Sequence, residues 1–117
     1  MIDLNILWIA ICIVESANNP QAIGDSGKAV GIAQIHAEVV QDWNQTHGHQ
    51  FTHADCFSVD ISKLLFESYM KRYCNARRIG HEPTLEDDAR IWNGGGNGWK
   101  KNSTLKYWKK IKKEVEK

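Results

Sequence analysis

The chain has 117 residues, of which 42% are hydrophobic and 25% charged, the profile of one ordinary globular domain. Its net charge of +1 excludes an overall field that would attract nucleic acid or a membrane. The charge is uneven, because residues 1–60 contain one lysine and seven acids, whereas residues 100–117 contain eight lysines and two acids. We therefore expect a single domain over residues 1–117 with an acidic first half and a basic last segment.

An apolar segment over residues 6–14 is similar to the centre of a signal peptide, but no lysine or arginine precedes it. Nine helical residues extend roughly 14 Å, about half the hydrocarbon thickness of a bilayer. We therefore expect neither a signal peptide nor a membrane span. Residues 3–16, which include Asp3, are instead predicted to form a buried helix enclosed by other elements, which ends before Asn19-Pro20. A buried strand is the alternative.

Two polar loops are predicted, over residues 18–31 and 44–57, with a short helix of about ten residues between them. This helix carries the apolar residues Val39, Val40 and Trp43. The pattern is typical of a helical protein with long connections.

A long helix is predicted to follow the second loop. Ser58 or Asp60 is its N-cap, and it continues past Arg77-Arg78 to a stop at Gly80. One uninterrupted helix is therefore expected over this segment.

Two further helices are predicted in the last third of the chain. Thr84 and Asp87 form a capping box for the first, which ends in the glycine-rich residues 93–98. Ser103 or Thr104 caps the second, which has lysines on one face. Its apolar face comprises Leu105, Trp108, Ile111 and Val115. The sequence thus predicts a mainly α fold.

The three cysteines, Cys12, Cys56 and Cys74, exclude a fully paired disulfide framework because their number is odd. A disulfide between Cys56 and Cys74 and free thiols at both positions remain open alternatives.

Glu15 is placed at the C-terminal end of the first predicted helix, beside the loop that follows. A carboxyl group in apolar surroundings has its charged form destabilised, so its pKa rises and it can hold a proton near neutral pH. Glu15 is therefore a candidate general acid. The alternative is a carboxylate that is satisfied at a helix end.

Three segments of the chain occur in the order found in the soluble-type lytic transglycosylases, which the chain resembles over most of residues 4–111. The segments are Glu15-Ser16 with Asn19-Pro20, then Gly31-Ile32-Ala33-Gln34-Ile35, then Ala89-Arg90-Ile91-Trp92-Asn93-Gly94-Gly95. The residues from Gly24 to Gln34 also resemble the goose-type lysozyme loop, G-D-x-G-x-x-x-G-x-x-Q.

The resemblance implies a single lysozyme-like domain in which a central buried helix carries the catalytic Glu15. It also implies cleavage of the β-1,4 bond between N-acetylmuramic acid and N-acetylglucosamine in peptidoglycan, without a cofactor. Asp25 is the candidate base or water-positioning group for hydrolysis, provided that it lies roughly 6.5–9.5 Å from Glu15 across the cleft. In the transglycosylase alternative, Glu15 acts as acid and then base and leaves a 1,6-anhydro end. A catalytically weak wall-binding domain is the third alternative.

The chain departs from both families at two positions. Trp92 replaces the motif tyrosine, so no phenol hydroxyl reaches the catalytic acid. His36 stands where goose-type lysozymes have an acid, and it either acts as a base or lines the cleft.

Substrate contacts are expected from side chains that suit sugars. Gln34 and Asn93 offer amides for N-acetyl groups and hydroxyls, the alternative being that they satisfy loop backbone. Trp99 is the candidate for stacking on a sugar ring, whereas Trp108 is assigned to the core. The full set of candidate substrate-binding residues is Ser16, Gln34, His36, Trp92, Asn93, Gly94 and Trp99.

The expected partner is the peptidoglycan glycan strand, met by a monomer in the periplasm or outside the cell. Residues 47–56 contain metal-ligating residue types at a spacing that matches no known site, so a polar loop without metal is expected. The lysine-rich last helix is interpreted as a solvated face, with contact to an anionic envelope as the alternative. A phage-encoded lysin or a virion component would fit the absent signal peptide. Nucleic-acid binding is not expected.

Overall fold

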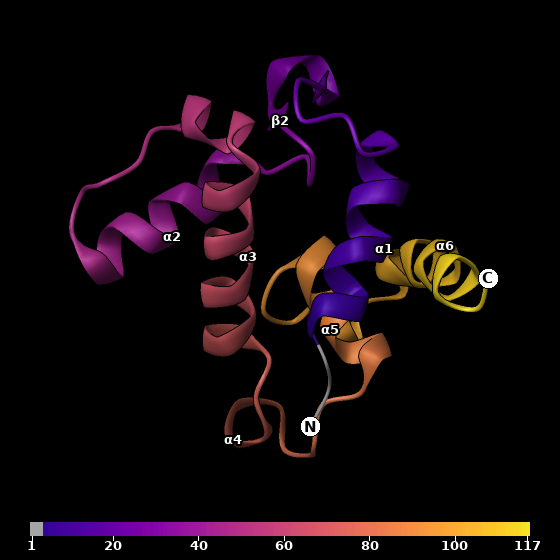
Figure 1. Ribbon diagram of the computed structural model, residues 1–117. Coiled ribbons are helices and arrows are strands. Elements are labelled where there is room, and N and C mark those ends of the chain that lie inside the picture. The colour runs from indigo at the N-terminus through magenta and orange to yellow at the C-terminus, as the bar shows by residue number, and fades with distance from the viewer. Residues whose placement is uncertain (1–3) are drawn as a thin grey trace. The chain divides into compact units, whose positions relative to one another are not determined.

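The computed structural model describes residues 4–117, and helices account for most of them (Figure 1). The predicted mainly α class is confirmed. The chain forms two compact units, one of residues Glu15–Tyr69 and one that joins the first helix up to Val14 to Met70–Lys117. None of the helices within residues 4–117 combines the length and the apolar composition needed to cross a bilayer.

A small hairpin opens the Glu15–Tyr69 unit. Strands β1 (Ile23–Gly24) and β2 (Ala29–Val30) pair antiparallel, and the 3-10 turn η1 (Asp25–Gly27) connects them. The sequence predicted only a loop here, because strands of two residues are too short to show an alternating pattern.

The predicted short helix is confirmed as α2 (Ala37–His47), with Val40 on its buried side. The polar segment that follows is not wholly irregular, since it contains the 3-10 helix η2 (His53–Phe57). Thr52 and Asp55 form a capping box at the start of η2. Polar residues such as Thr52 and Asp55 occur both in loops and at helix starts, so composition alone could not distinguish the two and predicted a loop.

The single long helix expected up to Gly80 is wrong, because α3 (Val59–Tyr73) and α4 (Ala76–Ile79) are separate helices. Asn75 interrupts them in an extended conformation, with φ −144°, and its Oδ1 accepts a hydrogen bond from Arg78 N at 3.0 Å. An asparagine that caps a new helix in this way competes with continuation of the old one. Gly80, with φ 88°, ends α4 in the left-handed conformation as expected.

Ser58 is the better of the two predicted caps of α3. Its Oγ accepts a hydrogen bond from Ile61 N at 3.3 Å. The start of α3 therefore follows the residue preference that the sequence indicated.

Helix α1 (Leu4–Ser16) confirms the helical prediction over its described residues; Asp3 lies outside them. The expectation that other elements enclose this helix on every side is wrong, because Ile6 and Ile9 are 48% and 60% exposed. These two residues border a groove of about 170 Å³ beside the last turn of helix α6, which ends at Val115. The end of α6 leaves this face of α1 uncovered.

Helix α5 (Leu85–Gly94) begins with the predicted capping box of Thr84 and Asp87. The turns η3 (Gly98–Lys100) and η4 (Asn102–Thr104) and helix α6 (Leu105–Val115) pack against it. This packing forms the core of the second unit.

The lysines of α6 are exposed, as predicted, while Ile111 is fully buried. Leu105 departs from the predicted apolar face because it is exposed, and Trp108 is only half-buried. The capping prediction also needs correction: Thr104 precedes α6, but its hydroxyl makes no cap hydrogen bond. That hydroxyl donates instead to Gly98 O at 2.7 Å.

All three cysteines are free thiols in this structure. Cys12 and Cys56 are buried, and Cys74 is half-buried. Of the two alternatives, the structure therefore has the free thiols.

Candidate functional site

Glu15 lies half-buried at the end of α1, where the neighbouring Ser16 fixes the backbone. The Ser16 hydroxyl donates to Ile32 O at 2.7 Å and accepts a hydrogen bond from Asn19 N at 3.1 Å. The first bond joins the first family segment to the second, and the second bond lies within the first segment. The end of the helix that carries Glu15 is thereby held in a defined position.

Gln34 fastens the loop to the hairpin. Its Nε2 donates to Ala22 O at 3.2 Å and to Gly31 O at 2.9 Å. Its Oε1 packs so closely on Gly24 that an added Cβ there would lie 2.3 Å from it. These contacts match the alternative reading of Gln34 as a residue that satisfies loop backbone, and contact with a sugar stays a prediction.

Asp25 and His36 come together in this unit. The imidazole Nε2 of His36 lies 3.3 Å from Oδ2 of Asp25, and the two side chains are 44% and 60% exposed. Asp25 belongs to the hairpin tip, whereas His36 occupies the N-cap position of α2. An exposed pair of this kind contributes little to stability, and its solvent-facing polar atoms remain accessible to water.

Residues 31–35 pack against the segment from His53 to Ser62, through contacts that the sequence did not predict. Gly31, with φ 84°, approaches η2 so closely that an added Cβ would lie 2.0 Å from Cys56 O. The Ser62 hydroxyl donates to the same carbonyl at 2.8 Å, and His53 Nε2 donates to Ile35 O at 2.7 Å. The family glycine thus permits a close backbone approach.

His53, in the histidine-rich segment, contributes to this support through its hydrogen bond to Ile35 O. In residues 4–117 no group of three or more histidines, cysteines or acids is arranged to hold a metal ion. The histidine therefore acts here through a hydrogen bond to the backbone. The sequence contains no local signal for this role, because the carbonyl that His53 contacts belongs to Ile35, 18 residues away in the chain.

The third family segment lies on α5, in the other unit. Trp92 is half-buried and Asn93 is exposed. Gly94 packs on η4, since an added Cβ would lie 2.5 Å from Thr104 Cγ2, and its carbonyl accepts a hydrogen bond from Lys101 Nζ at 2.8 Å. Gly94 is therefore required for packing, whereas Gly95, with φ 86°, follows the end of the helix.

Trp99 is half-buried and has two neighbours of its own. The His81 ring meets it edge-on, with 5.2 Å between ring centroids. Lys100 Nζ lies 5.0 Å from the centroid of the indole ring. Both contacts hold the indole in place, so the exposed part of the ring is presented in a defined orientation.

The structure thus distributes the predicted site residues over the two units. The Glu15–Tyr69 unit contains Glu15, Ser16, Asp25, Gln34 and His36. The other unit contains Trp92, Asn93, Gly94 and Trp99.

Comparison with known proteins identifies the family of this chain. A lysozyme of Meretrix lusoria is 42% identical to this chain over 52 residues, which cover 44% of the chain and 41% of that lysozyme. The model of one family, described as the transglycosylase SLT domain, matches residues 2–115 and so includes all three segments discussed above. The chain belongs to the transglycosylase SLT domain family.

Proposed function

We propose that this chain cleaves the β-1,4 bond between N-acetylmuramic acid and N-acetylglucosamine in peptidoglycan, with Glu15 as the general acid and water as the acceptor. The observation that carries the proposal is the family match over residues 2–115, in which Glu15 lies in the last turn of α1 beside a hydrogen-bonded loop. The lysozyme of Meretrix lusoria supports the hydrolytic outcome. We treat residues 1–117 as one catalytic domain.

In the proposed reaction, the Glu15 carboxyl group donates its proton to the glycosidic oxygen as the bond to the anomeric carbon breaks. Breaking such a bond requires protonation of the leaving oxygen and stabilisation of an oxocarbenium-like centre. The half-buried position of Glu15 limits the water that competes for this proton. Because Ser16 ties the helix end to Ile32, the acid needs little reorganisation.

The Asp25–His36 pair supplies the proposed hydrolytic half of the reaction. Asp25 accepts a proton from the attacking water, whose oxygen forms the new bond to the anomeric carbon. His36, 3.3 Å away, orients the carboxylate and lines the site. Asn93 and Trp99 are proposed to contact the N-acetyl groups and a sugar ring.

The alternative outcome is a lytic transglycosylase reaction. Its support is the family description, which names transglycosylases. In that reaction Glu15 acts as acid and then as base, and the muramic 6-hydroxyl replaces water. The products of the two reactions differ in mass by one water molecule.

Purified peptidoglycan sacculi test the assignment of Glu15. We expect wild type to clear the suspension and Glu15→Gln to lose at least about 100-fold of the rate, because the amide cannot donate an acidic proton. Glu38→Gln is the matched control, since Glu38 is an exposed acid in the first turn of α2. Equal clearing by wild type and Glu15→Gln would remove Glu15 from its role. Sacculus binding without clearing by wild type would instead establish a wall-binding domain.

Mass spectrometry of the released fragments separates the two reactions. Fragments with free reducing ends are expected from hydrolysis. Fragments that lack one water and carry 1,6-anhydromuramic ends would establish transglycosylation and exclude the water-activating role of Asp25.

The lysine-rich face of α6 is proposed to attract the domain to an anionic envelope. Its lysines are exposed, and an anionic surface attracts such a segment by about 1 kcal/mol per basic residue. Sedimentation with anionic and with neutral lipid vesicles checks this contact. We expect the chain to associate with the anionic vesicles and to lose this association in 0.5 M salt. Equal association with anionic and neutral vesicles would contradict the proposal.

A further inference from the structure

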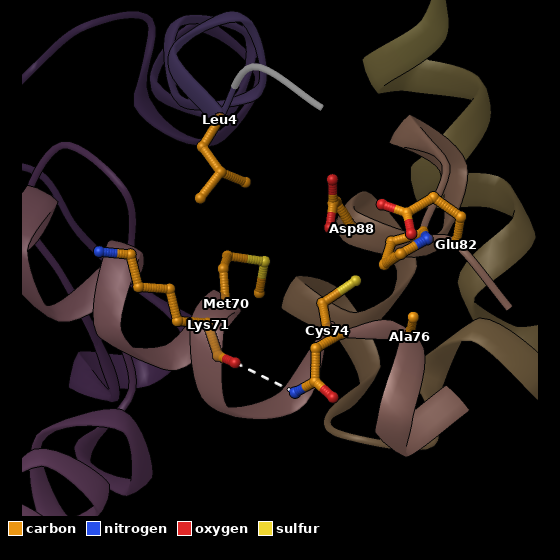
Figure 2. A pocket seen from close by; sticks show the side chains of 9 residues that line it. Leu4, Met70, Lys71, Cys74, Ala76, Glu82 and Asp88 are labelled. Carbon is orange, nitrogen blue, oxygen red and sulfur yellow. Dashed lines mark hydrogen bonds between the residues drawn. The ribbon is translucent and has the colours of Figure 1, made fainter. Parts of the chain in front are cut away.

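A pocket separate from the family segments lies in the unit that contains α5 and α6. Its volume is about 370 Å³, at the small end of the range for small-molecule sites, roughly 300–1,000 Å³. Figure 2 shows the side chains that surround it. The lining residues are Leu4, Met70, Lys71, Cys74, Asn75, Ala76, Glu82, Pro83 and Asp88.

The wall of this pocket contains a buried acid that lacks a full set of partners. Asp88 is only 3% exposed, and no polar atom of residues 4–117 hydrogen-bonds to its Oδ2. The carboxyl group of Asp88 accepts a hydrogen bond from the Cys74 thiol. In Figure 2 the thiol of Cys74 and the carboxyl group of Asp88 point toward one another. Buried polar atoms are seldom left unpaired, so Oδ2 of Asp88 is a candidate contact for a bound group.

The neighbours of Asp88 do not neutralise it. Burial raises the pKa of the Cys74 thiol well above its usual range, so that group stays a neutral donor. The adjacent Asp87 adds a second negative charge. Lys71 lines the pocket but is exposed, and in Figure 2 its chain extends away from Asp88. A buried carboxylate in this setting gains from a cation that enters from solvent.

The rest of the wall is mainly apolar. Leu4, Met70, Ala76 and Pro83 contribute hydrocarbon surface to the same pocket. A ligand that satisfies both parts carries one ammonium group and a short apolar body. Burying that body adds roughly 25 cal/mol per Å² of apolar surface to the attraction of the charges.

We propose that this pocket binds a small primary amine, with the ammonium group on Asp88 Oδ2 and the hydrocarbon body against Leu4, Met70 and Pro83. The carboxylate is the form that binds, and burial together with the charge of Asp87 raises the pKa of Asp88 to about 6. Near pH 7.5 Asp88 is therefore mainly ionised and ready to pair with a cation.

Titration of the ¹⁵N-labelled chain with n-hexylamine at pH 7.5 tests this proposal, with 1-hexanol as the uncharged probe of the same shape. We expect hexylamine to shift the amide signals of Cys74, Asp88 and their neighbours, and to bind at least about tenfold more tightly than hexanol. Equal affinity for the two probes, or signals that shift elsewhere, would overturn the site.

Two variants make the test specific. Asp88→Asn should lower the affinity for hexylamine at least about tenfold and leave that for hexanol unchanged. Ala76→Trp fills the pocket from its exposed rim and should abolish binding of both probes without altering Asp88, so it decides the question if Asp88→Asn does not fold. Asp60→Asn, an exposed acid on α3, is the control. Unchanged hexylamine affinity in a folded Asp88→Asn or Ala76→Trp chain contradicts the proposal.

Discussion

His36 Nε2 and Asp25 Oδ2 lie 3.3 Å apart, which joins the N-cap position of α2 to the tip of the β1–β2 hairpin. The sequence placed these residues 11 positions apart, as two separate candidates. Their proximity makes them one pair, for which we propose activation of water or contact with the substrate.

Asp25→Asn tests the role of the Asp25–His36 pair. The amide keeps the shape of the carboxylate but accepts no proton from water, so we expect hydrolysis to fall by about 100-fold or more. Mass spectrometry of the fragments should show the residual product moving toward 1,6-anhydro ends. His36→Gln, which keeps a donor near Asp25, should cost less. If Asp25→Asn hydrolyses at the wild-type rate, Asp25 is not the base.

Gly31→Ala tests the close approach between the family loop and η2. The new Cβ would lie 2.0 Å from Cys56 O, and φ is 84°, so we expect a loss of at least about 2 kcal/mol in the free energy of unfolding. Gly27→Ala is the matched control because φ is 91° and nothing lies within 4 Å of the added Cβ, which leaves a cost of about 1 kcal/mol. Urea unfolding measures both, and equal losses would contradict the role of the contact.

Thr104→Val tests the hydroxyl that joins α5 to the turns before α6. The Thr104 hydroxyl accepts a hydrogen bond from Arg90 Nε at 2.9 Å and donates to Gly98 O at 2.7 Å. Because Thr104 is buried, we expect its replacement to lower the free energy of unfolding by about 1–3 kcal/mol. The exposed neighbour is the control: Ser103→Ala should stay within about 0.5 kcal/mol of wild type. A Thr104→Val chain as stable as this control would show that the hydroxyl is dispensable.

Asp88 predicts how stability depends on pH. Burial, with the charge of Asp87, raises the pKa of Asp88 from 3.8 to about 6, so the folded state binds more protons than the unfolded state between these values. The contribution of Asp88 is complete below pH 3.8 and is lost as the pH rises through 6, by about 3 kcal/mol. Urea unfolding of wild type and Asp88→Asn at pH 4 and pH 7.5 isolates this term.

The expected result is that wild type loses more stability than Asp88→Asn between these two pH values. Other groups titrate in both chains and cancel in the comparison. Parallel pH profiles would mean that the pKa of Asp88 is the same in the folded and unfolded states.

Much of the local structure follows from short-range patterns in the sequence. Thr84 and Asp87 specify the start of α5, and Gly80 specifies the end of α4, because a cap depends on residues within one turn of the helix. The exposed lysines of α6 and the burial of Ile111 follow from the 3.6-residue period, although Leu105 departs from the predicted apolar face. These features required no knowledge of distant residues.

The family segments determined more than the periodicity did. They indicated that Glu15 and the loop up to Gln34 belong to a candidate site, and the family match includes these residues. The family segments did not predict which groups the side chains within them contact. Ser16 and Gln34 hydrogen-bond to carbonyls 16 and 12 residues away.

Only the tertiary structure decided the hairpin, the interruption at Asn75, the pairing of Asp25 with His36 and the pocket at Asp88. The hairpin, the Asp25–His36 pair and the pocket depend on groups that are distant in the chain. The interruption at Asn75 depends on a competition between continuing α3 and capping a new helix. Asp88, for example, appears in the sequence as one more acid in the first turn of a helix. In the structure Asp88 is buried and lines one pocket with Leu4, Cys74 and Pro83, and proximity across such separations leaves no periodic trace in the sequence.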